Sequence, residues 1–201
     1  MNIKHFSVHL GLGFALATFA VVAQTSTAQA QTGNQSDTTG AIVTTSDIAG
    51  GALRFDDNPE REALANQNAV NTVAGSVNQQ LASRTLRVVA TDSPTPIAAT
   101  VQENLAVIVT NTGNVNAATT RLASGLVNAC GNPASTQNLV SSLVGLTAGG
   151  NVNPQRFLQA TRAYNAFINE SSGGCLSNPP DELRAIRSIL AQLLNAALAR
   201  G

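Results

Sequence analysis

Residues 180–199 read PDELRAIRSILAQLLNAALA and carry the most regular apolar pattern of the chain. The centre of this pattern alternates steps of three and four residues: Leu183, Ile186, Leu190, Leu193 and Ala197. Three more apolar residues widen the stripe: Ile189, Leu194 and Leu198. This spacing predicts an α-helix, and Asp181 and Glu182 lie in its first turn, where the helix dipole favours carboxylates. We expect the helix to pack in the core of a domain, and a helix presented to a partner is the alternative.

Helix starts upstream of this stretch are marked by the dipeptide Asn-Pro, which occurs four times: at 58–59, 132–133, 153–154 and 178–179. A proline holds the preceding residue outside the α region, which suits an N-cap, and proline itself suits the first helical position. Four helices are therefore predicted to begin at or just after these sites: from Pro59 to about Ser83, from Pro133, from Pro154 and from Pro180.

Apolar spacing predicts two further helices, one from Ile97 to about Gly113 and one over Asn116–Cys130. The β-branched content of Thr85–Thr91 is typical of a short strand, which would pair with Leu53–Phe55 or stay extended without a partner. Together these patterns predict an all-α fold. We expect a single small helical domain over 52–201, with five or six helices and short connections, and a minor two-stranded element remains open.

Cys130 and Cys175 are the two cysteines of the chain. An even number of cysteines in an exported chain favours a disulfide, and two buried free thiols are the alternative. The bond would tie the end of one predicted helix to the approach to the last one. A redox role is disfavoured because the pair lacks the C-x-x-C spacing that lowers a thiol pKa.

The first 30 residues are typical of a signal peptide, with a basic start, an apolar run and a small-residue site. The apolar run is too short for a comfortable membrane span of about 20 residues. We predict cleavage between Ala30 and Gln31, with an uncleaved anchor as the alternative. Residues 31–51 are predicted to form a disordered, flexible leader, because they hold few large apolar residues to offset the entropy cost of ordering.

Cleavage at that point would remove every histidine, lysine and methionine from a chain that has no tryptophan. Loss of histidine excludes Ser-His-Asp and Cys-His nucleophile systems and the usual histidine zinc sites. Loss of lysine excludes Schiff-base chemistry and the phosphate-binding loop that ends in Gly-Lys. Ten arginines and eleven acidic residues then leave a net charge of −1. We therefore predict no cofactor, no nucleic-acid partner and no membrane span after cleavage.

The remaining candidate sites are carboxylates, a tyrosine and an arginine pair. An acidic cluster would bind Ca²⁺ or, in the interpretation we favour, stabilise a helix N-terminus: Asp56, Asp57, Glu60 and Glu62. A distant pair such as Glu103 and Glu170 would serve a glycosidase if it met across a cleft. Tyr164 is interpreted as a core residue with its hydroxyl at the edge rather than as a catalytic acid. Arg184 and Arg187 form a solvated helix face or grip a carboxylate or phosphate.

These observations predict a non-enzymatic structural or interaction protein that is exported, either secreted or periplasmic, in the bacterial envelope or extracellular space. Its partner would be a protein or another envelope component. No residue is assigned a catalytic, cofactor-binding or metal-ligating role. Two alternatives remain open: a carrier that holds an apolar small molecule between its helices, and a carboxylate-based hydrolase in which one of two close acids has a raised pKa.

Overall fold

A computed structural model describes residues 55, 66–88, 96–171 and 173–198 of the chain. The helices of this part follow one another in this order: α1 Gln67–Ala82, α2 Ala99–Thr110, α3 Val115–Cys130, α4 Pro133–Ser142, the 3-10 turn η2 Ala148–Gly150, α5 Pro154–Glu170, α6 Gly173–Ser177 and α7 Asp181–Leu198. The predicted all-α fold is confirmed, and the six longer α-helices match the predicted ones, whereas the short α6 was not predicted. The predicted signal peptide and leader, residues 1–51, lie outside the described residues.

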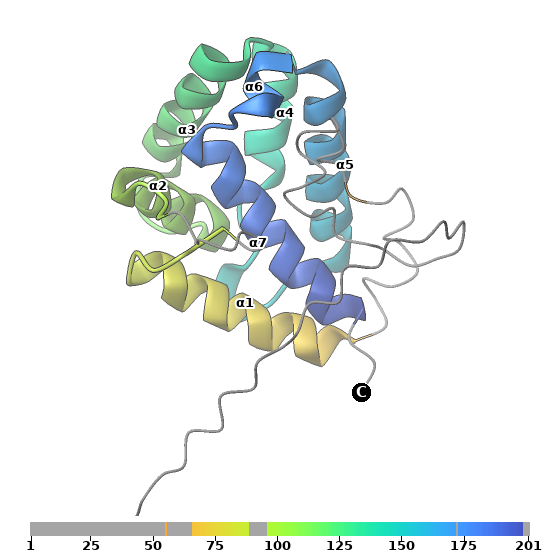
Figure 1. The fold of residues 1–201 in the computed structure, drawn as a ribbon. Coiled ribbons are helices and arrows are strands. Elements are labelled where there is room, and N and C mark those ends of the chain that lie inside the picture. Colours follow the sequence, from red (N-terminus) through yellow and green to blue (C-terminus); the bar gives the residue numbers. More distant parts are fainter. Residues whose placement is uncertain (1–54, 56–65, 89–95, 172, 199–201) are drawn as a thin grey trace, which may run out of the picture. The chain divides into compact units, whose positions relative to one another are not determined.

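Helix α7 is the element around which the other helices are arranged. It contacts α1, α2, α3 and α5, and each helix from α1 to α5 packs against the next one along the chain. Figure 1 shows α7 in the middle of the drawing, with α1 below it and α5 beside it. The helices from α1 to α5 therefore pack in sequence order, and the last helix, α7, packs among them.

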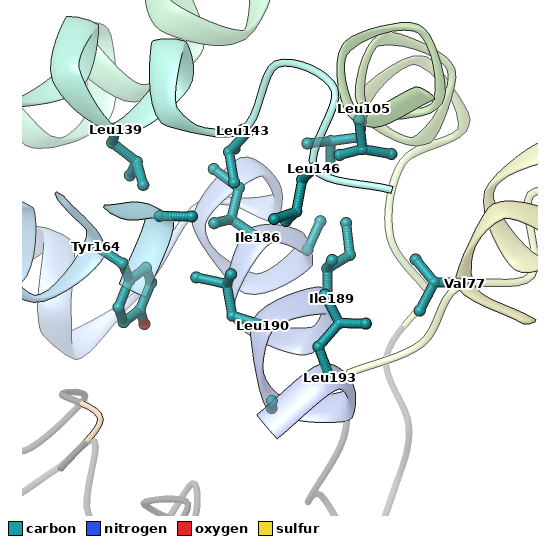
Figure 2. Close-up of a cluster of buried hydrophobic side chains, with 14 of the residues drawn as sticks. Val77, Leu105, Leu139, Leu143, Leu146, Tyr164, Ile186, Ile189, Leu190 and Leu193 are labelled. Atoms are coloured by element: carbon teal, nitrogen blue, oxygen red, sulfur yellow. The ribbon is translucent and has the colours of Figure 1, made fainter. Parts of the chain in front are cut away.

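The burial of α7 agrees with this central position. Between Leu183 and Ala197, only Arg184, Gln192 and Asn195 escape burial. Figure 2 shows its apolar side chains among those of α1, α2, α4 and α5: Val77, Leu105, Leu139 and Tyr164. A helix that is apolar on nearly all sides is stable only inside a core. The predicted core helix is therefore confirmed, and α7 is not presented to a partner.

Asparagine side chains cap the starts of four helices, but only two of these caps belong to the predicted Asn-Pro sites. Asn132 and Asn153 accept hydrogen bonds from backbone N–H groups in the first turns of α4 and α5. Asn66 and Asn114 do the same for α1 and α3 without a following proline. The predicted start of α1 at Pro59 is wrong, because Asn66 caps a helix that begins one residue later.

The connections are held by amide side chains that pair with loop backbone. On α1, the Gln67 amide donates to the Val152 carbonyl at 2.8 Å, and Asn71 Oδ1 accepts from the Val152 N–H at 3.0 Å. In α2, the buried Gln102 accepts from the Leu86 N–H at 2.9 Å and donates to the Ile97 carbonyl at 2.9 Å. These amides satisfy backbone groups that would otherwise be buried without partners.

The predicted strand over Thr85–Thr91 appears in the described residues as a single antiparallel bridge between Arg87 and Pro96. Residues 89–95 lie outside the described part. The expected pairing with residues 53–55 is wrong at Phe55, whose backbone bonds instead to a side chain of α5. Beside this bridge, the Leu86 N–H donates to Gln102 Oε1 at 2.9 Å and the Arg87 carbonyl accepts from the Ser188 hydroxyl at 2.6 Å.

Candidate functional site

The backbone of Phe55 is held by the side-chain amide of Asn165. The Phe55 N–H donates to Asn165 Oδ1 at 2.9 Å, and Asn165 Nδ2 donates to the Phe55 carbonyl at 3.0 Å. An amide placed in this way makes the two hydrogen bonds that a neighbouring β-strand would make with one residue. Both bonds go to the main chain, so Asn165 holds the backbone of Phe55 and not its side chain.

The side chain of Phe55 is seated against Tyr164. The two ring centroids lie 5.1 Å apart with an interplanar angle of 49°, which is within the range of favourable aromatic pairs. Phe55 is only 3% exposed, so the ring is enclosed as completely as a core residue. The backbone and the side chain of Phe55 are therefore held by two consecutive residues of α5.

The positions of Tyr164 and Asn165 follow from the burial pattern of α5. Its start is fixed by Asn153, and Tyr164 falls on its buried face together with Phe157, Phe167 and Ile168. Asn165, one residue later, is rotated to the edge of that face and is half-buried. Consecutive helical residues point about 100° apart, so one can line the core while the next reaches a chain that lies over the edge.

The hydroxyl of Tyr164 is buried together with the rest of its side chain. Burial raises the pKa of Tyr164 above its ordinary value, and the positive charge of Arg187 on α7 opposes this rise. The hydroxyl has no hydrogen-bond partner among the described residues. Tyr164 is confirmed as a core residue, but the expectation of a hydroxyl at the edge is wrong because the whole side chain is buried. We call the contact of Phe55 with Tyr164 and Asn165 the Phe55 site.

The two arginines of α7 have different environments. Arg187 is 5% exposed, so the prediction of a solvated helix face is wrong for it. Arg184 is half-buried and forms an ion pair with Asp181. Asp181 Oδ2 also accepts from the Ala98 N–H at 2.7 Å, which holds the start of α2 against the start of α7. The pair Arg184 and Asp181 is thus part of a contact between helices.

The glutamates considered as a catalytic pair have separate partners. Glu103 on α2 forms an exposed ion pair with Arg84, and Glu170 at the end of α5 accepts from the Asn132 amide at 2.9 Å. Within the described residues, no group of three or more His, Cys, Asp and Glu side chains comes together. The acidic cluster of Asp56, Asp57, Glu60 and Glu62 lies outside the described part.

Cys130 and Cys175 are joined in a disulfide, with their Cα atoms 4.9 Å apart. The bond links the last residue of α3 to the short helix α6, and both cysteines are buried. The bond closes a loop that contains α4 and α5. The predicted link between the end of the third helix and the approach to the last one is therefore confirmed. The predicted cleavage site between Ala30 and Gln31 lies outside the described residues.

Sequence reasoning missed Phe55 and Asn165 as partners. Phe55 carries a usable signal, because it is the only aromatic residue between the apolar run of the first 30 residues and Phe157. Asn165 carries none that distinguishes it from the many other asparagines of the chain. Among the described helices, none has the length and apolar character needed to cross a membrane. No protein-family model, curated protein or solved structure matches the chain.

Proposed function

We propose that the chain is an exported, non-enzymatic interaction protein of the bacterial envelope or extracellular space that binds extended polypeptide through the Phe55 site. The observation that carries this proposal is the pair of hydrogen bonds between the Asn165 amide and the Phe55 backbone, at 2.9 and 3.0 Å. A helical body has no sheet edge to offer to a partner strand. In its place, the Asn165 amide would bind the backbone of the partner and the Tyr164 ring would contact its apolar side chain.

The exposed surface of the described helices supports recognition through polar groups. In the part of the chain that the structure describes, no Leu, Ile, Val or Phe side chain is exposed, and the exposed apolar residues are alanines and prolines. An apolar docking patch is therefore not what these helices present. A partner would have to bring its own apolar anchor, as Phe55 does, and would be held by hydrogen bonds along its backbone.

The disulfide supports export. Disulfides form and persist mainly in oxidising compartments, and the buried Cys130–Cys175 bond joins α3 to α6. The intact mass of the protein from its native host, measured with and without reduction and alkylation, tests this part. We expect the mass of residues 31–201, with two alkylations only after reduction. An unprocessed mass with two free thiols would contradict export.

Photo-cross-linking in the native host tests the interaction. A photoreactive amino acid would replace Asn169, which is exposed and lies one turn beyond Asn165 on α5. The matched control would place it at Ser124, which is exposed on α3. We expect a polypeptide adduct from position 169 and none from position 124. Equal adducts from both positions, or none from either, would contradict a binding function at the Phe55 site.

A further inference from the structure

We propose that the Phe55 site is a latch that controls proteolysis of the chain. While closed, it shields the peptide bond between Arg54 and Phe55 from arginine-specific proteases, and it opens without unfolding of the helices. The inference concerns the chain's own Phe55 and needs no partner, so it goes beyond the proposed binding function. Cleavage at this bond would separate all residues before position 55 from the helical part of the chain.

The bond that the latch guards follows an arginine, because Arg54 directly precedes Phe55 in the sequence. In its hydrolysis, the oxygen of water ends on the carbonyl carbon of Arg54, the C–N bond breaks, and the nitrogen of Phe55 leaves with a proton as an amine. A protease must hold the residues on both sides of the bond in its active site. The leaving nitrogen is the one whose hydrogen bond to Asn165 the structure describes.

The closed latch keeps Phe55 away from a protease in two ways. Its N–H and carbonyl groups are both bonded to the Asn165 amide, at 2.9 and 3.0 Å. Its ring lies 5.1 Å from the Tyr164 ring, and the whole residue is 3% exposed. A residue held in this way cannot enter an active-site cleft, so cleavage after Arg54 requires that Phe55 first leaves α5.

The latch can open while the helices stay folded, because Phe55 belongs to none of the described helices. Its backbone bonds and its ring contact all go to two consecutive residues of α5. Helix α5 is itself held by other contacts: Asn153 caps its start, and it packs against α4 and α7. Opening of a segment with so few contacts costs less free energy than unfolding of the whole domain.

Asn165 is the residue through which the latch can be loosened without a change at the cleaved bond. Its amide makes both backbone hydrogen bonds to Phe55, and each such bond favours the closed state several-fold. When reclosing is faster than cleavage, the rate of cleavage follows the population of the open state. Loss of the amide should therefore accelerate cleavage after Arg54, although the sequence around that bond is unchanged.

The test is limited proteolysis of the full chain by trypsin under native conditions. All chains carry Arg61→Gln, so that Arg54 is the only trypsin site between Gln31 and Arg84. Mass spectrometry of the released peptide that ends at Arg54 gives the initial rate, and the free peptide GALRFDDNP, residues 51–59, gives the rate of the unshielded bond. Cleavage in the folded chain should be at least tenfold slower than in the peptide. Asn165→Ala should accelerate it at least tenfold.

Two controls decide how the latch opens. Asn169→Ala, at an exposed position of α5, should leave the rate at Arg54 unchanged. Arg187 on α7 is 5% exposed, so trypsin reaches the bond after it only when the helices unfold. Relative to free peptides of the two sites, cleavage at Arg54 should be at least tenfold faster than at Arg187.

Three results would overturn the latch: cleavage at Arg54 as fast in the folded chain as in the peptide, equal rates in Asn165→Ala and Asn169→Ala, or equal relative rates at Arg54 and Arg187. The first would show that the bond is not shielded, and the second that Asn165 does not hold it. The third would show that the helices must unfold first. The mass and cross-linking experiments do not depend on these rates, so export and partner binding are judged separately.

Discussion

At the scale of single residues, Gln102 is an amide side chain that is buried and bonds to the backbone of a connection. Gln102 is 2% exposed and makes three hydrogen bonds to backbone: it accepts from Leu86 N–H and donates to the carbonyls of Ile97 and Arg84, at 2.9, 2.9 and 3.3 Å. It therefore joins both ends of the connection between α1 and α2. An amide is suited to this position because it has both a donor and an acceptor and no charge to desolvate.

Substitution of Gln102 by leucine should therefore be costly. Leucine has a similar size but leaves the Leu86 N–H and the Ile97 carbonyl without partners, and an unsatisfied buried polar group costs about 1–3 kcal/mol. We expect a loss of about 2–4 kcal/mol in the free energy of unfolding, measured by urea denaturation. Gln137→Leu is the control, because Gln137 is exposed and bonds only to Ser141. A loss that is equally small in both variants would contradict the role assigned to Gln102.

Tyr164 makes stability depend on alkaline pH. Burial raises its pKa in the folded chain, whereas the unfolded side chain ionises near pH 10. Above that pH the unfolded side chain loses its proton while the folded one keeps it, so the free energy of unfolding decreases. The decrease is about 1.4 kcal/mol per pH unit. Tyr164 is the only tyrosine, and arginines remain protonated.

We expect Tyr164→Phe to remove most of this fall between about pH 9 and 11, as measured by urea denaturation at several pH values. The substitution should cost little at neutral pH, because the hydroxyl has no hydrogen-bond partner among the described residues. Absorbance of the phenolate reports the ionisation of this one side chain in the unchanged protein. An equally steep fall in the phenylalanine variant would contradict the assignment.

At the scale of elements, substitutions at two glycines distinguish the effect of helix propensity on stability from the effect of backbone strain. Gly75 lies inside α1, and a Cβ added there would meet no atom within 4 Å. Gly113 also has open space around it, but it lies between α2 and α3 with φ at 68°. Alanine is favoured in the first case because it reduces the entropy of the unfolded chain. It is disfavoured in the second because a Cβ strains the left-handed conformation.

We therefore expect Gly75→Ala to raise the free energy of unfolding by about 0.5–1 kcal/mol. Gly113→Ala should lower it by about 1–2 kcal/mol. Thermal unfolding of the two variants beside the unchanged chain measures both effects. Changes of the same sign in the two variants would show that space, and not backbone conformation, decides the outcome.

The starts of the helices show which features the local sequence predicts correctly and which it does not. Asn132 and Asn153 cap α4 and α5 because the proline that follows each one prepares both the cap and the first helical residue. The same dipeptide at 58–59 does not start α1, which begins at Gln67 behind Asn66. A cap is a local preference of the backbone, so the dipeptide alone does not fix where a helix begins.

At the scale of the whole molecule, the fold was predictable and the site was not. The apolar spacing of α7 is local, and a helix that is apolar on nearly all sides has only the core to occupy. The contact between Phe55 and Asn165 joins residues 110 positions apart, and neither belongs to a local pattern that would pair them. The burial of Arg187 is likewise set by the helices around α7, which the spacing of arginines on one helix does not reveal.

The disulfide joins the end of α3 to α6, and its removal tests how much the fold depends on it. The bond joins residues 45 positions apart, and the loop-entropy model gives about 4 kcal/mol for a loop of this size. Cys130→Ala/Cys175→Ala should therefore lose about 4 kcal/mol in urea denaturation, and alanine is suitable because both positions are buried. Reductant should destabilise the unchanged protein to a similar extent and leave the variant unaffected. A loss well below 1 kcal/mol would mean that the unfolded chain is already constrained without the bond, because the model credits the bond only with restricting that state.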